Sequence, residues 1–319
     1  MSQISVNQKA MELVRELCAN AEMYGVKVKK SNQGAFIIDA GLEAKGSIEA
    51  GRVITEICLG GLGRATISSI QLGSQNFPLI SVSTDYPAIS TLGSQMAGWR
   101  IKLDDYQALG SGPARALALK PKSVFERIAY RDDCNEAVLV LEANREPPED
   151  VIASVSESCH VSADRLFIIV VPITSVSGFT QVSGRTVETG IHKLANLGFD
   201  PKLIIRAWGS APILPVHRDP VEAMGRSNDA ILYGGETHVA VNYDDDEELK
   251  QLAEKSVSSA SKQYGRPFAE ILRKAHLDFY KIDSGLFAPA VMTINNLKTG
   301  KTFSAGRINI DVLMSALSR

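Results

Sequence analysis

The stretches Ala137-Val-Leu-Val-Leu141 and Leu166-Phe-Ile-Ile-Val-Val171 decide the fold class of this chain. Each is a short apolar run, which is typical of a strand buried on both faces. Between them, Pro147-Pro-Glu-Asp150 opens a helix, because proline suits the first helical turn. A strand, a helix and a second strand in this order favour an α/β protein.

The same alternation extends from these stretches in both directions. We expect helices over 7–24, 47–58, 88–97, 184–197 and 221–232, and strands over 35–39, 79–84, 203–208, 238–242 and 291–295. A polar, proline-bearing joint, Asn144-Arg-Glu-Pro-Pro148, interrupts the series. We therefore expect an N-terminal α/β domain over 1–145 and a C-terminal one over 146–319.

Composition and charge exclude several classes of protein. The 319 residues are 45% hydrophobic and 22% charged, which is globular and neither disordered, collagen-like nor coiled-coil. The net charge of −2 gives no overall drive toward nucleic acid or an anionic membrane. No run approaches the ~18 apolar residues of a membrane-spanning helix. The start, Met1-Ser-Gln-Ile-Ser, lacks the pattern of a signal peptide, so we expect a cytoplasmic protein.

Metal and nucleotide motifs are missing from the sequence. None of the 4 cysteines forms a Cys-x-x-Cys pair, and none of the 5 histidines has a second ligand at metal spacing, so we expect reduced thiols and no metal. The turn Gly110-Ser-Gly112-Pro-Ala-Arg115 is a candidate anion cradle, since it precedes a helix and offers free N–H groups and a forked donor. The alternative is a tightly packed helix N-terminus that binds no anion.

Arg185 and Glu188 lie three positions apart inside an expected helix, so guanidinium and carboxylate share one face. On an exposed face they would form an ordinary surface ion pair of little net value. In a pocket, Arg185 would fix Glu188 and tune its affinity for protons during work on water. Similarly, Met224-Gly-Arg-Ser-Asn-Asp229 is either a helix turn with surface charges or a polar site on a core element. Spacing alone does not decide either case.

Several motifs, spread in order over nearly the whole chain, together closely resemble the methenyltetrahydromethanopterin cyclohydrolase family. They are Gly46-Ser-Ile-Glu-Ala-Gly51, Ile57-Cys-Leu-Gly-Gly-Leu-Gly63, Gly93-Ser-Gln-Met-Ala-Gly-Trp99, Ala108-Leu-Gly-Ser-Gly-Pro-Ala-Arg115, Gln181-Val-Ser-Gly-Arg-Thr-Val-Glu188, His192-Lys-Leu194, Ala223-Met-Gly-Arg-Ser-Asn-Asp-Ala-Ile-Leu-Tyr-Gly-Gly235 and Leu286-Phe-Ala-Pro-Ala290. The first half is more similar to the enzymes of methylotrophic bacteria than to those of methanogenic archaea.

The resemblance implies two α/β domains flanking a deep interdomain cleft, assembled as a homotrimer. It implies hydrolysis of the methenyl form of a tetrahydromethanopterin carrier to the formyl form in one-carbon metabolism, without a metal or an organic cofactor. The family's catalytic pair falls on Arg185 and Glu188. Its motifs also place substrate contacts at Ser94, Gln95, Ser111, Gly112, Arg115, Arg226 and Asn228.

The chemistry that the resemblance implies needs few groups. The methenyl bridge is a cationic amidinium carbon, so no zinc is needed to polarise it. Glu188 would place one water against that carbon and take its proton, while Arg185 orients the carboxylate. Three alternatives remain: a phosphosugar or nucleotide enzyme that uses Gly110–Arg115 as its phosphate cradle, a pterin-binding protein without activity, and a structural α/β oligomer.

Overall fold

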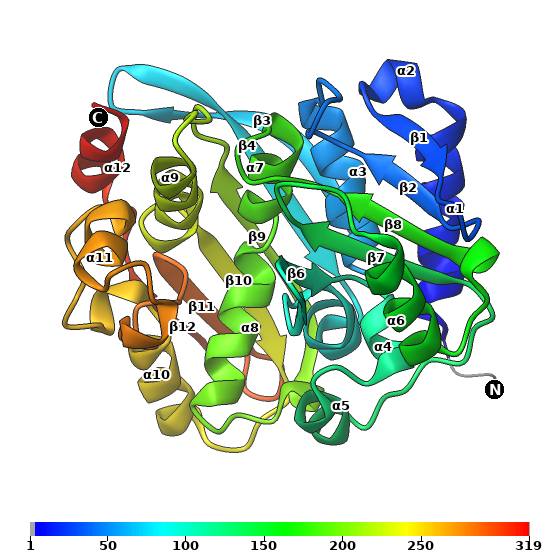
Figure 1. The fold of residues 1–319 in the computed structure, drawn as a ribbon. Coiled ribbons are helices and arrows are strands. Elements are labelled where there is room, and N and C mark those ends of the chain that lie inside the picture. Colours follow the sequence, from blue (N-terminus) through cyan, green and yellow to red (C-terminus); the bar gives the residue numbers. More distant parts are fainter. Residues whose placement is uncertain (1–3, 319) are drawn as a thin grey trace. The chain divides into compact units, whose positions relative to one another are not determined.

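The computed structural model describes residues 4–318, without the side chain of Tyr280, and confirms the α/β class. The first three residues, part of the start in which we expect no signal peptide, lie outside this range. The chain forms two compact units, each built on a six-stranded mixed sheet (Figure 1). The first unit combines the chain up to Arg64 with Ala88–Gln181, and the second combines Ala65–Pro87 with the chain from Val182 onward.

These units do not coincide with the expected division at 145. The strands on either side of that point, β7 (Ala137–Glu142) and β8 (Leu166–Val170), pair in parallel within one sheet. The helix α6 (Glu149–Cys159) connects them. The joint at Asn144–Pro148 is therefore a strand-to-helix loop inside the first unit, which needs polar residues and proline as much as a linker does.

The sheet of the first unit has the strand order β1-β2-β8-β7-β6-β5. Its other strands are β1 (Lys27–Lys30), β2 (Phe36–Asp39), β5 (Trp99–Leu103) and β6 (Tyr106–Ser111). The strands β2, β8 and β7 run parallel, and the remaining neighbours are antiparallel. Val138 and Val140 face one apolar core while Leu139 and Leu141 face the other. A strand buried on both faces has to be apolar throughout, which explains the run at 137–141.

Helices cover both faces of this first sheet. One core contains residues of α1 (Val6–Ala19) and α3 (Ile48–Cys58), and the other contains residues of α4 (Ala114–Ala118) and α6. The unit also holds α2 (Ala21–Tyr24), α5 (Lys122–Ile128), the π-helix η1 (Ala88–Gln95) and the 3₁₀ turn η2 (Ala163–Arg165). The π-helix replaces the ordinary helix expected over 88–97.

The sheet of the second unit has the order β12-β11-β10-β9-β4-β3. Its strands are β3 (Gly63–Leu72), β4 (Gln75–Thr84), β9 (Ile204–Pro212), β10 (Glu236–Val241), β11 (Val291–Asn296) and β12 (Thr302–Gly306). The strands β10 and β11 run parallel, whereas β4, β9 and β10 pair antiparallel in turn. The inserted segment Ala65–Pro87 therefore supplies the part of this sheet beyond β9.

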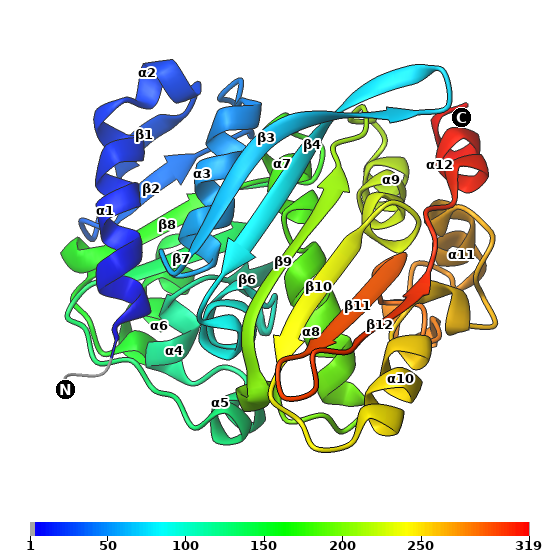
Figure 2. The ribbon, with the colours of Figure 1, turned by 180° about the vertical axis from the view of Figure 1, so that it is seen from behind.

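The helices of the second unit gather on one face of its sheet, and Figure 2 shows the opposite face toward the viewer. They are α8 (Thr186–Asn196), α9 (Pro220–Leu232), α10 (Asp246–Lys255), α11 (Phe268–Lys274) and α12 (Ile310–Leu317), with short turns η3 (Pro201–Leu203), η4 (Ser258–Ala260) and η5 (Phe279–Lys281). The helix α7 (Val176–Ser183) contains the passage between the units. Within residues 4–318, none of the helices has both the length and the apolar character to cross a membrane.

Candidate functional site

Both predicted catalytic residues lie at the N-terminal end of α8. Arg185 occupies the N-cap position, and its carbonyl accepts the first helical hydrogen bond from the N–H of Thr189 at 2.8 Å. Glu188 lies in the first turn of the same helix. A carboxylate there interacts favourably with the positive end of the helix dipole. One short segment thus presents a guanidinium and a carboxylate at the same helix end.

Hydrogen bonds hold this helix end against β9 and β10. The Thr237 hydroxyl donates to the carbonyl of Thr186 at 2.8 Å, and the Thr186 hydroxyl donates to the carbonyl of Glu236 at 3.4 Å. Just before the helix, the Ser183 hydroxyl donates to the carbonyl of Pro212 at 3.0 Å. These contacts fix the backbone that carries Arg185 and Glu188, as a precise site requires.

The absence of a side chain at Gly190 lets α8 approach the sheet closely. A Cβ at this position would lie 2.6 Å from Cγ2 of Thr237, well inside van der Waals contact. The same threonine makes the hydrogen bond to Thr186, so close packing and hydrogen bonding act at one point of β10. The height of α8 above its sheet is therefore set within the same helix that carries Glu188.

Arg185 and Glu188 are each only 8% exposed, so the alternative of an exposed surface pair does not describe them. Among residues 4–318, the ion pairs of 4.0 Å or less do not include one between these two side chains. The carboxylate of Glu188 is thus buried without being neutralised by an ion pair of the described chain. Such a group is costly to bury alone, and it suits a site that receives a cation.

Arg226 and Asn228 lie on α9 in the same unit. The helix begins at the N-cap Asp219, whose carboxylate accepts from the N–H groups of Val221 and Glu222 at 3.0 Å each. Arg226 is 6% exposed and donates to the carbonyl of Pro215 at 3.1 Å. The side chain of Asn228 donates to the backbone of its own helix. The polar cluster of α9 is consequently an inward-facing feature at Arg226 and not a turn of surface charges.

The predicted contact residues of the first unit come from segments that meet. The N–H of Gly112, after β6, donates to the carbonyl of Ser94 in η1 at 2.9 Å. The Ser94 hydroxyl donates to the carbonyl of Cys58 at the end of α3 at 2.6 Å. Ser94, Gln95 and Ser111 are all buried. The motifs at 93–99 and 108–115 thus form one local structure.

Arg115 is bound inside this local structure. Its side chain is 0% exposed, and it donates to the carbonyls of Leu92 and Ser94 at 3.1 Å each and of Lys120 at 2.8 Å. The helix behind Gly112 is only five residues long. These contacts favour the packing alternative for the turn Gly110–Arg115 over a phosphate cradle that uses this guanidinium.

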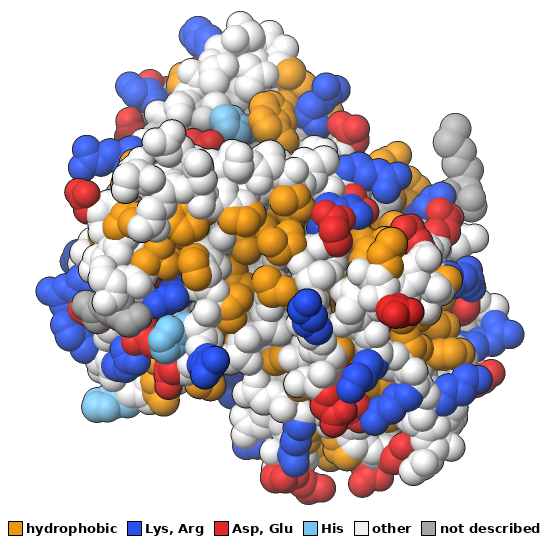
Figure 3. Space-filling model, turned by 90° about the horizontal axis from the view of Figure 1, so that it is seen from above, with side chains coloured by type: hydrophobic (Ala, Val, Ile, Leu, Met, Phe, Trp, Pro, Cys, Tyr) orange, Lys and Arg blue, Asp and Glu red, His pale blue; other side chains and the backbone are white. Residues whose placement is uncertain are grey.

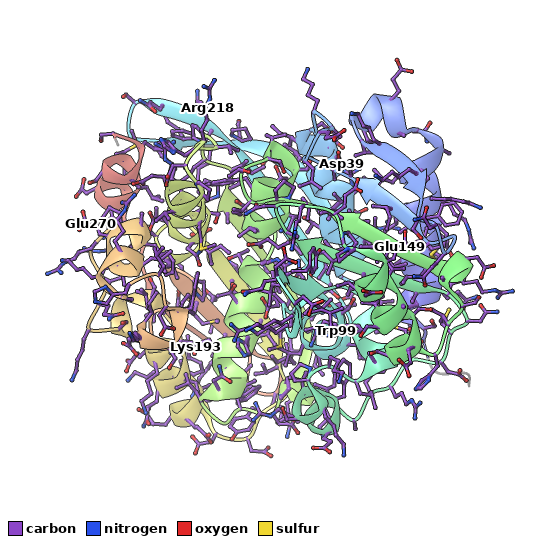
Figure 4. All side chains as sticks on the ribbon, in the orientation of Figure 1. Asp39, Trp99, Glu149, Lys193, Arg218 and Glu270 are labelled. Atoms are coloured by element: carbon purple, nitrogen blue, oxygen red, sulfur yellow. The ribbon has the colours of Figure 1, made fainter. Side chains whose placement is uncertain are left out.

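Sequence reasoning gave no role to Lys193, which is buried on α8 and labelled in Figure 4. Its ammonium group donates to the carbonyl of Gly285 at 3.2 Å, next to the motif Leu286–Ala290. Burial lowers the pKa of Lys193, and the nearby carboxylate of Asp283 partly opposes that shift. The motif His192-Lys-Leu194 was the available signal, but its spacing does not show which partner the lysine finds.

The described residues include no group of three or more His, Cys, Asp or Glu side chains arranged to hold a metal ion.

The family model described as Cyclohydrolase (MCH) matches residues 5–317. Three relatives carry the name methenyltetrahydromethanopterin cyclohydrolase. The protein of Methanothermobacter thermautotrophicus is 45% identical over 98% of this chain and 99% of its own length. The proteins of Methanocaldococcus jannaschii and Methanococcoides burtonii are 43% and 41% identical, each over 98% of both chains. The closer likeness to bacterial enzymes stays a prediction.

Proposed function

Because the chain belongs to the methenyltetrahydromethanopterin cyclohydrolase family, whose members are hydrolases of a cyclic amidine, we propose that it converts methenyl-tetrahydromethanopterin and water to the formyl derivative in one-carbon metabolism. The match over residues 5–317 supports this proposal. Within the molecule, the observation that carries it is the buried carboxylate of Glu188 at the start of α8, which no ion pair of the described residues neutralises.

Glu188 acts as the general base in this proposal. The water oxygen forms a bond to the cationic methenyl carbon, and its proton passes to the carboxylate. The neutral tetrahedral adduct then breaks one carbon–nitrogen bond: the proton held by Glu188 goes to the departing nitrogen, and the hydroxyl proton is released to solvent as the C=O bond of the formyl group forms on the other nitrogen. The negative charge of Glu188 also attracts the cationic substrate, so binding and water activation use one group.

Arg185 is a positioning residue in this scheme. Its backbone lies at the N-cap of the helix whose first turn carries Glu188. When substrate and water occupy the site, this guanidinium holds the carboxylate in the orientation that accepts the proton. The fixed planar geometry of arginine suits that task better than the flexible ammonium of lysine.

The remaining predicted residues are proposed to contact the substrate. They are Arg226 and Asn228 in the second unit and Ser94, Gln95, Ser111 and Gly112 in the first. For Arg115 the buried bonds to three carbonyls support an indirect role, in which it shapes the segment that carries Ser94 and Gly112. The absence of a cofactor, the cleft between the domains, the homotrimer and the cytoplasmic location stay predictions from the resemblance.

The proposal is tested by adding the purified protein to methenyl-tetrahydromethanopterin and following the methenyl chromophore. We expect the absorbance to fall faster than in buffer, with formation of the formyl product. A pterin-binding protein without activity would bind the compound and leave the rate at the buffer value. A phosphosugar or nucleotide enzyme would be stabilised against heat by its own substrates and not by the pterin.

A further inference from the structure

A cationic pocket lies in the second unit, beside α11. It has a volume of about 290 Å³, near the lower end of the range for small-molecule sites. Its polar lining comes from the segment before α11, from the end of α11 and from η5. These lining residues are Lys262, Gln263, Tyr264, Arg266, Lys274 and Lys281. None of them has been given a role in the cyclohydrolase reaction.

The charge of this pocket is one-sided. Four of its lining residues are cations, and the described lining includes no carboxylate. Among residues 4–318, Lys262, Arg266 and Lys274 take part in no ion pair of 4.0 Å or less. Lys281 has a long contact of 3.9 Å to Asp278, and both side chains are well exposed. Like charges that converge on one cavity repel each other, and an anion between them offsets that repulsion.

Another cation of α11, outside the pocket lining, does form an ion pair with a carboxylate of the protein. Arg273, one position before Lys274, makes an ion pair of 2.7 Å with Glu222 on α9. The helix therefore neutralises one of two consecutive cations against the protein and leaves the other facing the pocket. In a chain with more acidic than basic residues, this separation concentrates uncompensated positive charge at one place. Figure 3 shows Lys and Arg side chains on the left side of the view, where α11 lies in Figure 1.

The segment before α11, which carries four of the lining residues, is held in place by Tyr233, the C-cap residue of α9. The Tyr233 hydroxyl accepts from the N–H groups of Gly265 and Arg266 at 3.2 Å each and donates to the carbonyl of Arg266 at 2.6 Å. The ring of Tyr264 packs on the ring of Tyr233 with centroids 5.1 Å apart. The side-chain oxygen of Gln263 accepts from the N–H of Asp283 at 2.9 Å. A preorganised wall lowers the entropic cost of binding.

We propose that this pocket binds a small polyanion, a molecule that carries two or more phosphate or carboxylate groups. Lysines supply mobile point charges, and Arg266 supplies a planar forked donor that matches either kind of anionic group. The phenol of Tyr264 and the amide of Gln263 add polar groups to the lining. The site is separate from the residues proposed for hydrolysis, so either proposal can fail without the other.

Isothermal titration calorimetry of the full chain at low salt tests the proposal, with inorganic pyrophosphate and with citrate as probes. We expect saturable binding of at least one probe, and the stronger probe identifies phosphate or carboxylate as the preferred group. The double variant Arg266→Ala/Lys274→Ala should weaken binding about tenfold or more, because charge-assisted hydrogen bonds are lost. The single variant Lys274→Gln, at an exposed position, should weaken it less but measurably.

The matched control is Lys45→Ala/Lys255→Ala, which also removes two exposed positive charges but lies outside the pocket. We expect this control to bind within about twofold of the wild type, since distant surface charges are screened. Equal weakening in both double variants would show general attraction by net charge and overturn the site. The absence of saturable binding of either probe to the wild type would overturn it as well. Circular dichroism of each variant establishes that it is folded.

Discussion

At position 188, a carboxylate is 8% exposed and pairs with no cation of the described chain, so its replacement tests chemistry more than stability. We expect Glu188→Gln to reduce kcat by ~10²–10⁴-fold, the usual contribution of a general base. KM should rise much less than kcat falls, because the amide keeps the shape of the side chain and loses only its attraction for the cationic substrate. Stopped-flow loss of the methenyl chromophore measures both constants. Glu254→Gln, at an exposed position of α10, is the control, and a normal kcat for Glu188→Gln would remove this residue from the mechanism.

Arg185 is tested by a pair of variants that separate charge from shape. Arg185→Ala should lower kcat more than it raises KM, since a misplaced carboxylate still attracts the cationic substrate. Arg185→Lys should restore part of kcat, because it returns the positive charge without the planar fork. The split between kcat and KM for the three proteins is the measurement. Equal constants for wild type and Arg185→Ala would leave this arginine with a structural role only.

Individual site residues were predictable from the sequence to different degrees. The sequence placed Arg185 and Glu188 inside one helix, whereas the structure begins that helix at Thr186, with Arg185 as its N-cap and Glu188 in its first turn. For Arg115, the sequence of the turn Gly110–Arg115 was compatible both with binding an anion and with packing inside the protein. The structure gives it the carbonyls of Leu92, Ser94 and Lys120, from segments whose approach no local pattern encodes.

At the scale of elements, Asp39 shapes the turn that leads from β2 toward α3, and Figure 4 labels it. Its carboxylate accepts from the N–H groups of Gly41, Leu42, Glu43 and Ala44 at 2.6–2.9 Å. Burial by itself raises the pKa of Asp39, but the four N–H donors outweigh burial and lower it. The folded chain therefore stabilises the ionised form of the Asp39 carboxyl.

We therefore expect Asp39→Asn to lower the free energy of unfolding by about 1–2 kcal/mol near neutral pH, because the amide oxygen replaces two acceptor atoms by one. A carboxyl with a depressed pKa in the folded state stabilises the protein above its unfolded pKa, and that contribution is lost as the pH falls through the folded value. The difference between the two proteins should accordingly shrink below about pH 4. Urea unfolding from pH 7 to pH 3 measures it, and a constant difference over that range would contradict this account.

A second feature at this scale is the close packing of α8 against β10. Gly190→Ala would place Cβ 2.6 Å from Cγ2 of Thr237, so the helix has to move or the threonine has to yield. We expect a loss of about 1–3 kcal/mol of stability and a lower kcat, because Glu188 moves with the helix. The loss should be smaller in a Thr237→Ser background, which removes Cγ2 and keeps the hydroxyl that binds Thr186. A double-mutant cycle by thermal unfolding and activity gives the coupling, and additive effects would contradict direct contact.

Elements were predictable where local signals agree. The apolar runs became β7 and β8, and the helix expected over 47–58 became α3, where the hydroxyl of the N-cap Ser47 accepts from the N–H of Ala50. The small residues over 88–97 indicated a helix but not that it is a π-helix, because the hydrogen-bond register depends on what packs against it. The helix α7 was not expected, since Ser, Gly and Thr fill it and carry weak helical signals.

At the scale of the whole molecule, the order of elements along the chain predicts the α/β class but not the division into units. Sheet membership depends on pairings between strands that are distant in sequence. The strands β3 and β4 lie in the first third of the chain, yet β4 pairs with β9 over Leu79–Thr84 and Ala207–Pro212. A polar joint such as Asn144–Pro148 gives no information on such a pairing, so the discontinuous units could be found only in three dimensions.

This discontinuity predicts that the chain cannot be divided at residue 145. A fragment over 1–145 lacks β8, which lies between β2 and β7 and pairs with both. The removal takes from β2 and β7 the strand that they share, and it takes the residues of β8 and α6 out of the apolar cores. The complementary fragment over 146–319 lacks β3 and β4, and so exposes the edge of β9.

We expect neither fragment to show cooperative thermal unfolding by circular dichroism, whereas the intact chain should. Buried strands that lose their partners leave unsatisfied N–H and carbonyl groups, which no rearrangement of side chains replaces. Mixing the two fragments should restore cooperativity in part, because each holds the strands that the other misses. A folded and monomeric 1–145 fragment would show that β2 and β7 do not need β8. It would contradict our view that the chain up to Arg64 and the segment Ala88–Gln181 fold as one unit.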